Sequence, residues 1–435
     1  MTKPSQELRT RLASEIDAID IVDTHEHVPD EAAAYAHPLG LFGFFDHYVS
    51  SDLVSAGMPR EALEQMRSPD SGLSIDERWA LLADFWPYVR HTGYGRAMRE
   101  YMADLFDVDD IGEDTYAILC ERIDAAHRPG WYETVLKDKA RIAAALVTTW
   151  PGQSVAVDPA YFRAVPILDH YATAATRADL EALEAESDRS IQTLAQLLGA
   201  LEARLAGIVE QGVAGIKVFL AYRRPLLFER VDEAAAARCF DRIWLSQALD
   251  LAFEDLKPLQ DFVMWHLVGL AADRGLAIQV HTGLQEGNGN YLENSRPTLL
   301  ANLFMAFGDA RFDLFHAGYP YTGEAAALAK NFANVALDLC WVQAISPLVA
   351  ARTLDEWIDT VPANKIFAVG GDSNYAEGAY GHCKVARRVA CEVLAGKVES
   401  GGLSEDEAAW YARRILRENA EAFFRLDLGN ATDRA

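Results

Sequence analysis

Short apolar runs rich in β-branched residues recur along the chain, and segments of helical periodicity separate them. Each run is six to nine residues long and is bounded by polar or glycine-containing stretches, the pattern of strands in parallel βα units. The pattern predicts eight strands, at residues 18–25, 141–149, 162–168, 213–220, 276–281, 311–316, 334–339 and 365–372.

The segments between these runs place apolar residues on one helical face. The clearest are Leu180–Gln211, Leu256–Arg274, Pro297–Phe307 and Glu324–Phe332. Eight βα units predict an α/β fold, a closed (β/α)₈ TIM barrel. The alternative is a doubly wound open sheet, which usually carries a glycine-rich turn after its first strand. Here THEHVPDE stands at that point instead, which favours the barrel.

Two further regions of helical pattern lie outside the repeating units. Residues of about 30–139 are too many for one βα connection and are rich in aromatic side chains, so we expect a helical insertion over the mouth of the barrel. Two C-terminal helices are expected at residues 381–398 and 403–426, the second opened by a capping box from Ser404 to Glu407. With no internal repeat, residues 1–435 are interpreted as one domain.

Composition and charge restrict the partners. The formal charge of −25, from 65 acidic and 40 basic residues without a basic cluster, argues against nucleic acid. Neither an 18-residue apolar run nor a signal-peptide pattern is present, so no membrane contact is expected. Five scattered cysteines favour a reducing compartment, the cytoplasm. The sequence leaves homo-oligomerisation open.

Residues that commonly bind metals stand at the ends of several predicted strands. His25 and His27 are two apart on the first strand, so both rings should point to one face. His281, His316 and Asp372 each close a later strand, and barrel enzymes place their catalytic groups at that end. We expect one divalent metal, zinc with manganese or iron as alternatives, held by His25, His27, His281 and Asp372. A second metal stays open.

Residues for substrate binding are expected near the fourth and fifth strands. Lys217 lies within an apolar strand, where it is a salt-bridged structural residue, a cation for the substrate, or a carboxylated bridge between two metals. Tyr222 and Arg223 follow at the strand's mouth, and Asn288 lies in a turn-rich loop. Among the remaining histidines, His47 and His91 are the best placed to reach the pocket.

The motifs DTHEH, GIKVFLAYR, QVHTG, LFHAGYPYTGE and VGGDSN, in this order, resemble the amidohydrolase superfamily. More narrowly, the chain resembles the metal-dependent hydrolase module at the N-terminus of glutamine-synthetase-like fusion proteins. It is also similar to uronate isomerases, which share the insertion after the first strand. The resemblance implies that His25 and His27 are ligands and that Asp372 is both ligand and proton shuttle. Unlike uronate isomerases, the chain has no arginine in Asp372-Ser373-Asn374.

We therefore expect a metal-dependent hydrolase, in which activated water cleaves an amide, lactone or related C–N or C–O bond of a small carboxylate-bearing substrate. Asp372 would carry the proton, and His316 would polarise the carbonyl or bind a second metal. Lys217 and Arg223 would hold the carboxylate. Alternatives are a uronate isomerase or decarboxylase using the same metal, and a binding or scaffold protein without activity.

Overall fold

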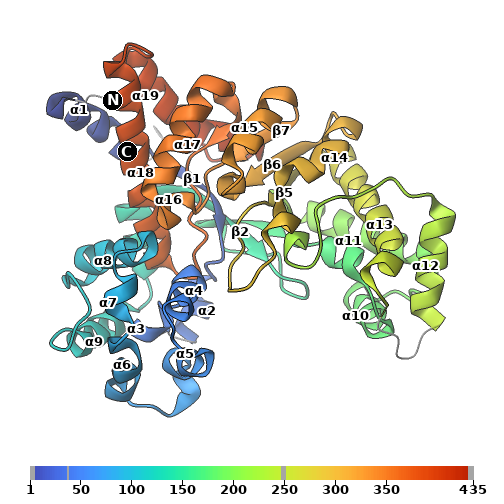
Figure 1. The fold of residues 1–435 in the computed structure, drawn as a ribbon, viewed down its shortest axis with the longest axis horizontal. Helices are drawn as coiled ribbons and strands as arrows, with labels where there is room; N and C mark the ends of the chain where they lie inside the picture. Colours follow the sequence, from blue (N-terminus) through green and yellow to red (C-terminus); the bar gives the residue numbers. More distant parts are fainter. Residues whose placement is uncertain (1–4, 37–38, 246–250, 430–435) are drawn as a thin grey trace.

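The computed structural model describes residues 5–36, 39–245 and 251–429. Eight parallel strands form its centre, and helices separate them along the chain except between β2 and β3 (Figure 1). The strands are β1 Ile21–Glu26, β2 Ile142–Thr149, β3 Phe162–Pro166, β4 Gly215–Val218, β5 Ala277–His281, β6 Arg311–Phe315, β7 Val335–Asp338 and β8 Ile366–Phe367. Each lies within one of the eight ranges predicted from the pattern or one residue beyond it.

Backbone contacts close these strands into a barrel. Strands β1 to β3 pair in order, and β4 to β8 pair in order. A parallel bridge between Ile167 and Lys217 joins the two groups. Past the end of β8, the chain pairs with β1, because Thr24 N–H donates to the Val369 carbonyl at 3.0 Å. The predicted (β/α)₈ TIM barrel is confirmed.

The segment between β1 and β2 is a helical insertion, as expected. Figure 1 shows its helices grouped on one side of the strands, opposite α10 to α13. Its elements are α2 Glu31–Ala36, α3 Gly40–Gly43, α4 His47–Ser55, α5 Arg60–Arg67, η1 Pro69–Ser71, α6 Ile75–Ala83, α7 Trp86–Val89, α8 Gly93–Phe106, α9 Tyr116–Ala126 and η2 Glu133–Lys139.

Helices also follow the later strands, with one correction to the predicted pattern. The single segment expected at Leu180–Gln211 is two helices, because Asp188 takes a left-handed conformation with φ 50° and ends the first. The elements are η3 Asp169–Thr173, α10 Arg177–Ser187, α11 Leu194–Glu210, η4 Leu220–Tyr222, α12 Glu233–Leu245, α13 Phe253–Asp273, η5 Leu292–Ser295, η6 Pro297–Leu300, α14 Ala301–Ala306, η7 His316–Gly318, α15 Thr322–Asn331, α16 Val342–Ile345, α17 Pro347–Thr360 and η8 Ala363–Lys365.

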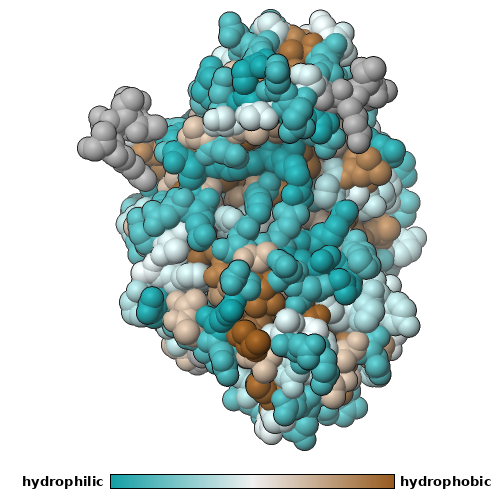
Figure 2. Space-filling model, turned by 90° about the vertical axis from the view of Figure 1, so that its left-hand side faces the viewer, coloured by the Kyte–Doolittle hydropathy of each residue, from teal (hydrophilic) through white to brown (hydrophobic). Residues whose placement is uncertain are grey.

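The two ends of the chain pack together beside the barrel (Figure 1). The N-terminal helix is α1 Gln6–Asp17, and the C-terminal elements are α18 Ala376–Glu399, α19 Glu405–Arg413, η9 Arg414–Glu418 and α20 Asn419–Phe423. The capping box predicted at Ser404 and Glu407 is present at the start of α19. Among the described residues, no helix combines the length and apolar character that a membrane crossing requires. The face in Figure 2 is mostly hydrophilic, with hydrophobic groups in its lower half.

Candidate metal centre

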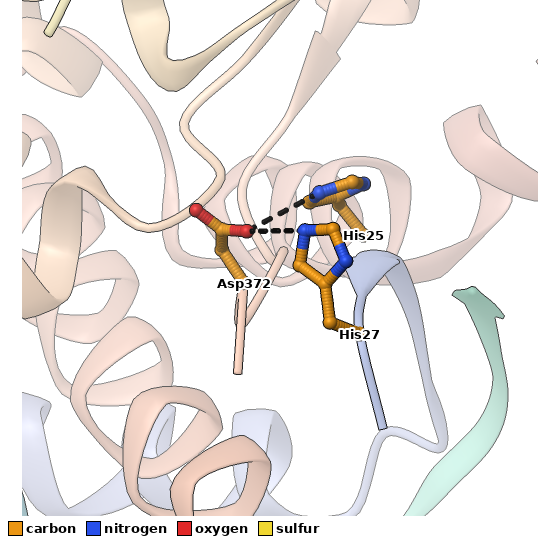
Figure 3. Close-up of side chains that lie close together, drawn as sticks. All are labelled: His25, His27 and Asp372. Atoms are coloured by element: carbon orange, nitrogen blue, oxygen red, sulfur yellow. Dashed lines mark ion pairs between the residues drawn. The ribbon is translucent and has the colours of Figure 1, made fainter. Parts of the chain in front are cut away.

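Three of the four predicted ligands meet above the end of β1. His25 lies in β1 and His27 directly follows this strand, and the rings of both point toward Asp372, which follows β8 (Figure 3). Asp372 Oδ1 lies 3.2 Å from His25 Nε2 and 3.3 Å from His27 Nε2. One ligand atom from each residue lies within 4.8 Å of the others. The two imidazole rings and the carboxylate thus direct their ligand atoms at one common point.

The donor set and its surroundings fit a divalent metal. Two nitrogens and one oxygen suit zinc, manganese or iron. His25 Nδ1 faces Thr148 Oγ1 at 3.5 Å, which leaves Nε2 on the side of Asp372. The His27 ring stacks on Trp150 with centroids 5.9 Å apart, which fixes its orientation.

His281 and His316 lie beside this cluster rather than within it. His281 Nε2 donates to the Leu284 carbonyl at 3.2 Å, so this nitrogen could bind a metal only by giving up that hydrogen bond. His316 Nδ1 donates to the Cys340 carbonyl at 3.3 Å, and its Nε2 is 4.0 Å from Asp372 Oδ2. His281 as fourth ligand therefore stays a prediction.

Burial favours the neutral form of His25, His281 and His316, which is the form of histidine that binds metal. Burial, and then the charge of Lys217, lowers the pKa of His25 well below its usual range and that of His281 to about 3. Burial, and then the neighbouring His281, also lowers the pKa of His316 well below its usual range. A metal would thus meet unprotonated rings at neutral pH.

Asp372 remains ionised although it is buried. Burial opposes the charge, but His47 and the hydrogen bonds from His25 and His27 outweigh it. Together they hold the pKa of the Asp372 carboxyl well below its usual range. The carboxylate is therefore available both to a cation and as a base.

Lys217 reaches the same cluster from β4. Its Nζ lies 3.1 Å from His25 Nε2 and 4.1 Å from the centre of the Phe315 ring. Among the described residues, no carboxylate oxygen lies within 4.0 Å of Nζ, so the salt-bridged structural role is not what the structure shows. Burial lowers the pKa of Lys217 to about 8, against the charge of Asp372.

A cavity of about 180 Å³ opens above the cluster. Its wall is polar and includes acids, imidazoles and one amine, which suits a small hydroxylated molecule. The lining residues are His27, Asp46, His47, Trp150, Lys217, Phe219, Tyr222, His281, Glu286, His316, Asp372 and Asn374.

The predicted substrate-binding residues separate in the structure. Lys217 and Tyr222 line the cavity, and the Tyr222 hydroxyl accepts from Glu286 N–H at 2.9 Å. Arg223 is exposed and lines a neighbouring cavity instead. Asn288 does not line the cavity, and its Nδ2 donates to the Ser51 carbonyl at 3.0 Å.

Several lining residues were not predicted from the sequence. Trp150 and Phe219 directly follow β2 and β4, so the rule that placed His25 and Asp372 could have found them had it included aromatic residues. His47, which was expected to reach the pocket, does so from the start of α4, with Nε2 3.8 Å from Asp372 Oδ1. His91 is exposed and does not line the cavity.

Comparisons with known proteins show which proteins are similar to this chain. A sequence profile described as Amidohydrolase matches residues 22–426. Protein fluG of Emericella nidulans is 27% identical over 51% of this chain, but the match spans only 26% of fluG. A uronate isomerase of Nostoc punctiforme is 23% identical over 95% of this chain and 94% of its own length. The crystal structure of a Thermotoga maritima uronate isomerase superposes with TM-score 0.80 at 18% identity, covering 97% and 98% of the two chains.

These comparisons correct the activity expected from the sequence. Two relatives that match over nearly their whole length are uronate isomerases, as are three solved structures of the same fold. The prediction of a metal-dependent hydrolase is therefore wrong, because the motifs on which it rested are shared by enzymes of different reactions. With the profile match over residues 22–426, the chain belongs to the amidohydrolase family.

Proposed function

We propose that this chain is a metal-dependent isomerase that interconverts the aldose and ketose forms of a hexuronate. The observation that carries the proposal is a polar cavity, closed by His25, His27 and Asp372, in a chain similar to uronate isomerases over nearly their full length. Such a reaction needs a base beside the carbon that loses a proton and a cation for the charge that develops on oxygen.

One zinc ion, with manganese or iron as alternatives, would be held by His25, His27 and Asp372. Bound there, the ion would stabilise negative charge on substrate oxygen. Lys217 Nζ, 3.1 Å from His25, leaves a second metal open if the amine is carboxylated.

The proton moves through residues of the chain itself. Asp372 is ionised, and its Oδ2 faces His316 Nε2 at 4.0 Å. Asp372 takes the proton from the carbon beside the carbonyl and returns it to the neighbouring carbon. His316 and His47, neutral on either side of Asp372, relay protons between the substrate oxygens.

The wall of the cavity orients the substrate. Lys217, buried beside the histidines, attracts the substrate carboxylate. Asp46 and Glu286 accept hydrogen bonds from sugar hydroxyls, and Asn374, held by Asp46 Oδ2 at 2.7 Å, donates to them. Arg223 and Asn288 have no part in this proposal, because neither lines the cavity.

We further propose that residues 1–435 act as one domain in the cytoplasm on a small carboxylate substrate, alone or as a homo-oligomer. All five cysteines are free, as a reducing compartment favours.

Product analysis tests the proposal. Zinc-loaded protein is incubated with a panel of free hexuronates, and the products are followed by NMR and mass spectrometry. We expect a keto acid of unchanged mass to accumulate with at least one member. A product heavier by one water, loss of carbon dioxide, or no reaction with any hexuronate would contradict the proposal.

A further inference from the structure

Three successive backbone N–H groups around Asp372 all donate to β1. Gly371 N–H donates to Asp23 Oδ1 at 3.1 Å, and Ser373 N–H donates to Glu26 Oε2 at 2.7 Å. Between them, Asp372 N–H donates to the His25 carbonyl at 2.8 Å. The strand that carries His25 and leads directly into His27 thus also holds the backbone of Asp372.

This backbone needs to be held, because Asp372 has a φ of 53°. A left-handed conformation costs a residue with a side chain about 1–2 kcal/mol and persists only where its surroundings enforce it. The loop cannot relax toward Glu26, since a Cβ added to Gly371 would lie 1.9 Å from Glu26 Oε1. The Glu26 carboxyl therefore lies directly against the Gly371 backbone.

Asp23 and Glu26 do not reach the cavity, so neither can contact a substrate there. Both are fully buried, and neither lines the cavity. The register of β1 is irregular between Asp23 and Glu26, and the two carboxyl groups interact with each other. Asp23 Oδ1 also accepts from His25 N–H at 3.1 Å, which ties the same carboxylate to a ligand residue. Burying an acid costs free energy unless the acid is hydrogen-bonded, and these backbone N–H groups supply hydrogen bonds to both.

We propose that Asp23 and Glu26 are positioning residues that clamp the Gly371–Ser373 backbone, so that the Asp372 carboxylate faces His25 and His27 and the centre binds its metal tightly. The proposal rests on the proposed metal centre. The two carboxyls act through backbone N–H groups and never touch the metal or the substrate.

The test compares zinc affinity in two buried glutamate variants. Glu26→Met keeps the length of the side chain but removes the acceptor of Ser373 N–H, and we expect zinc affinity, measured by competition with a chelator, to fall 10- to 100-fold, the usual cost of losing such a supporting hydrogen bond. The visible absorption of the cobalt-substituted protein should shift as well. Glu26→Gln keeps an amide oxygen as acceptor and should restore most of the affinity.

Glu377→Met is the matched control. Glu377 is also buried, and its Oε1 accepts from His127 Nε2 and Trp131 Nε1, but it makes no hydrogen bond to the Gly371–Ser373 backbone. Its zinc affinity and cobalt spectrum should match the wild type even if stability falls. A folded Glu26→Met protein with unchanged affinity and spectrum would overturn the clamp. If the wild-type protein bound no zinc, the proposed metal centre itself would be rejected.

A measurement on the wild type covers the case in which Glu26→Met does not fold. With serine selectively labelled by ¹⁵N, the Ser373 amide should exchange with solvent far more slowly than that of exposed Ser154. Equal exchange rates for the two amides would show that Glu26 does not hold Ser373, and the clamp would be rejected.

Discussion

At the scale of single residues, burial inside the barrel changes the protonation of carboxyl groups. Asp313 on β6 is fully buried, its Oδ2 accepts from Gln279 Nε2 at 3.0 Å, and its Oδ1 has no partner among the described residues. Burial raises the pKa of Asp313 to about 7, against the hydrogen bond from Gln279. The folded protein therefore holds this carboxyl protonated at a pH where the unfolded chain ionises it.

Asp313→Asn should accordingly change how stability depends on pH. A raised folded pKa means that the stabilising contribution of Asp313 is complete below the unfolded pKa of 3.8 and is lost as the pH rises to about 7. The asparagine does not titrate, so the variant should gain stability relative to the wild type by up to about 1.4 kcal/mol per pH unit over this range. Urea unfolding of both proteins at several pH values measures the difference. A difference independent of pH would show that Asp313 is ionised in the fold.

Asp372→Asn separates the two roles proposed for this residue. The amide keeps one coordinating oxygen but loses the basic carboxylate, so zinc should be partly retained while turnover of a hexuronate falls by roughly 10² to 10⁴. Zinc content by elemental analysis and kcat by NMR give the two readouts. Near-normal turnover in the variant would assign the proton transfer to His316 or another group.

The position of a residue at a strand end could be predicted from the sequence, but its direction beyond the strand could not. His25 and His27 lie in or directly after β1, which indicates their direction, whereas Asp372 lies five residues past the end of β8 and is held by its backbone hydrogen bond to His25. Arg223 was expected in the pocket, yet β4 ends at Val218 and the turn of η4 carries Arg223 to a neighbouring cavity. Asp46 comes from the insertion, where no repeating pattern indicates which side chain faces the site.

At the scale of elements, one close contact joins the insertion to the barrel. Gly93 is the first residue of α8, and a Cβ added there would lie 1.9 Å from the Ala344 carbonyl oxygen in α16. The two backbones therefore pack without space for a side chain. This contact fixes the insertion, which carries Asp46 and His47, against the mouth of the barrel.

Gly93→Ala should destabilise the protein and displace the insertion. Overpacking against backbone atoms costs about 1–3 kcal/mol, and we expect the KM for the substrate to rise as His47 moves. Gly199→Ala in α11 is the control, because open space surrounds that position and alanine should stabilise the helix by about 0.5–1 kcal/mol. Thermal unfolding and steady-state kinetics measure both. A Gly93→Ala protein as stable as the control would show that the contact is not rigid.

Element type was predictable wherever periodicity was sustained, and boundaries were less so. β8 was expected over residues 365–372, but the regular strand is Ile366–Phe367, because the following residues bond to Thr24 and Trp341 outside a regular ladder and end at Asp372 in a left-handed conformation. The helical character of the insertion followed from its aromatic and apolar spacing. Its division into many short helices depends on contacts with the barrel, which local patterns do not contain.

At the scale of the whole molecule, the barrel could be predicted and the reaction could not. Eight strands with ligand residues at their ends indicate the architecture and a metal site together. The same ligands serve hydrolases and isomerases, so the choice between them depends on how the cavity holds its substrate. The net charge of −25 does not decide this choice either, because Lys217 and a metal bound at the proposed centre would dominate the local field.

The most direct test of the account is a metal titration of isomerase turnover. Wild-type protein is stripped with a chelator, and zinc is added stepwise while conversion of a hexuronate to its keto acid is followed by NMR. The account predicts no turnover without metal, a linear rise that ends at one zinc per chain, and no recovery in His25→Ala at the same zinc concentration. Full isomerase activity in the metal-free protein, or in His25→Ala, would contradict it.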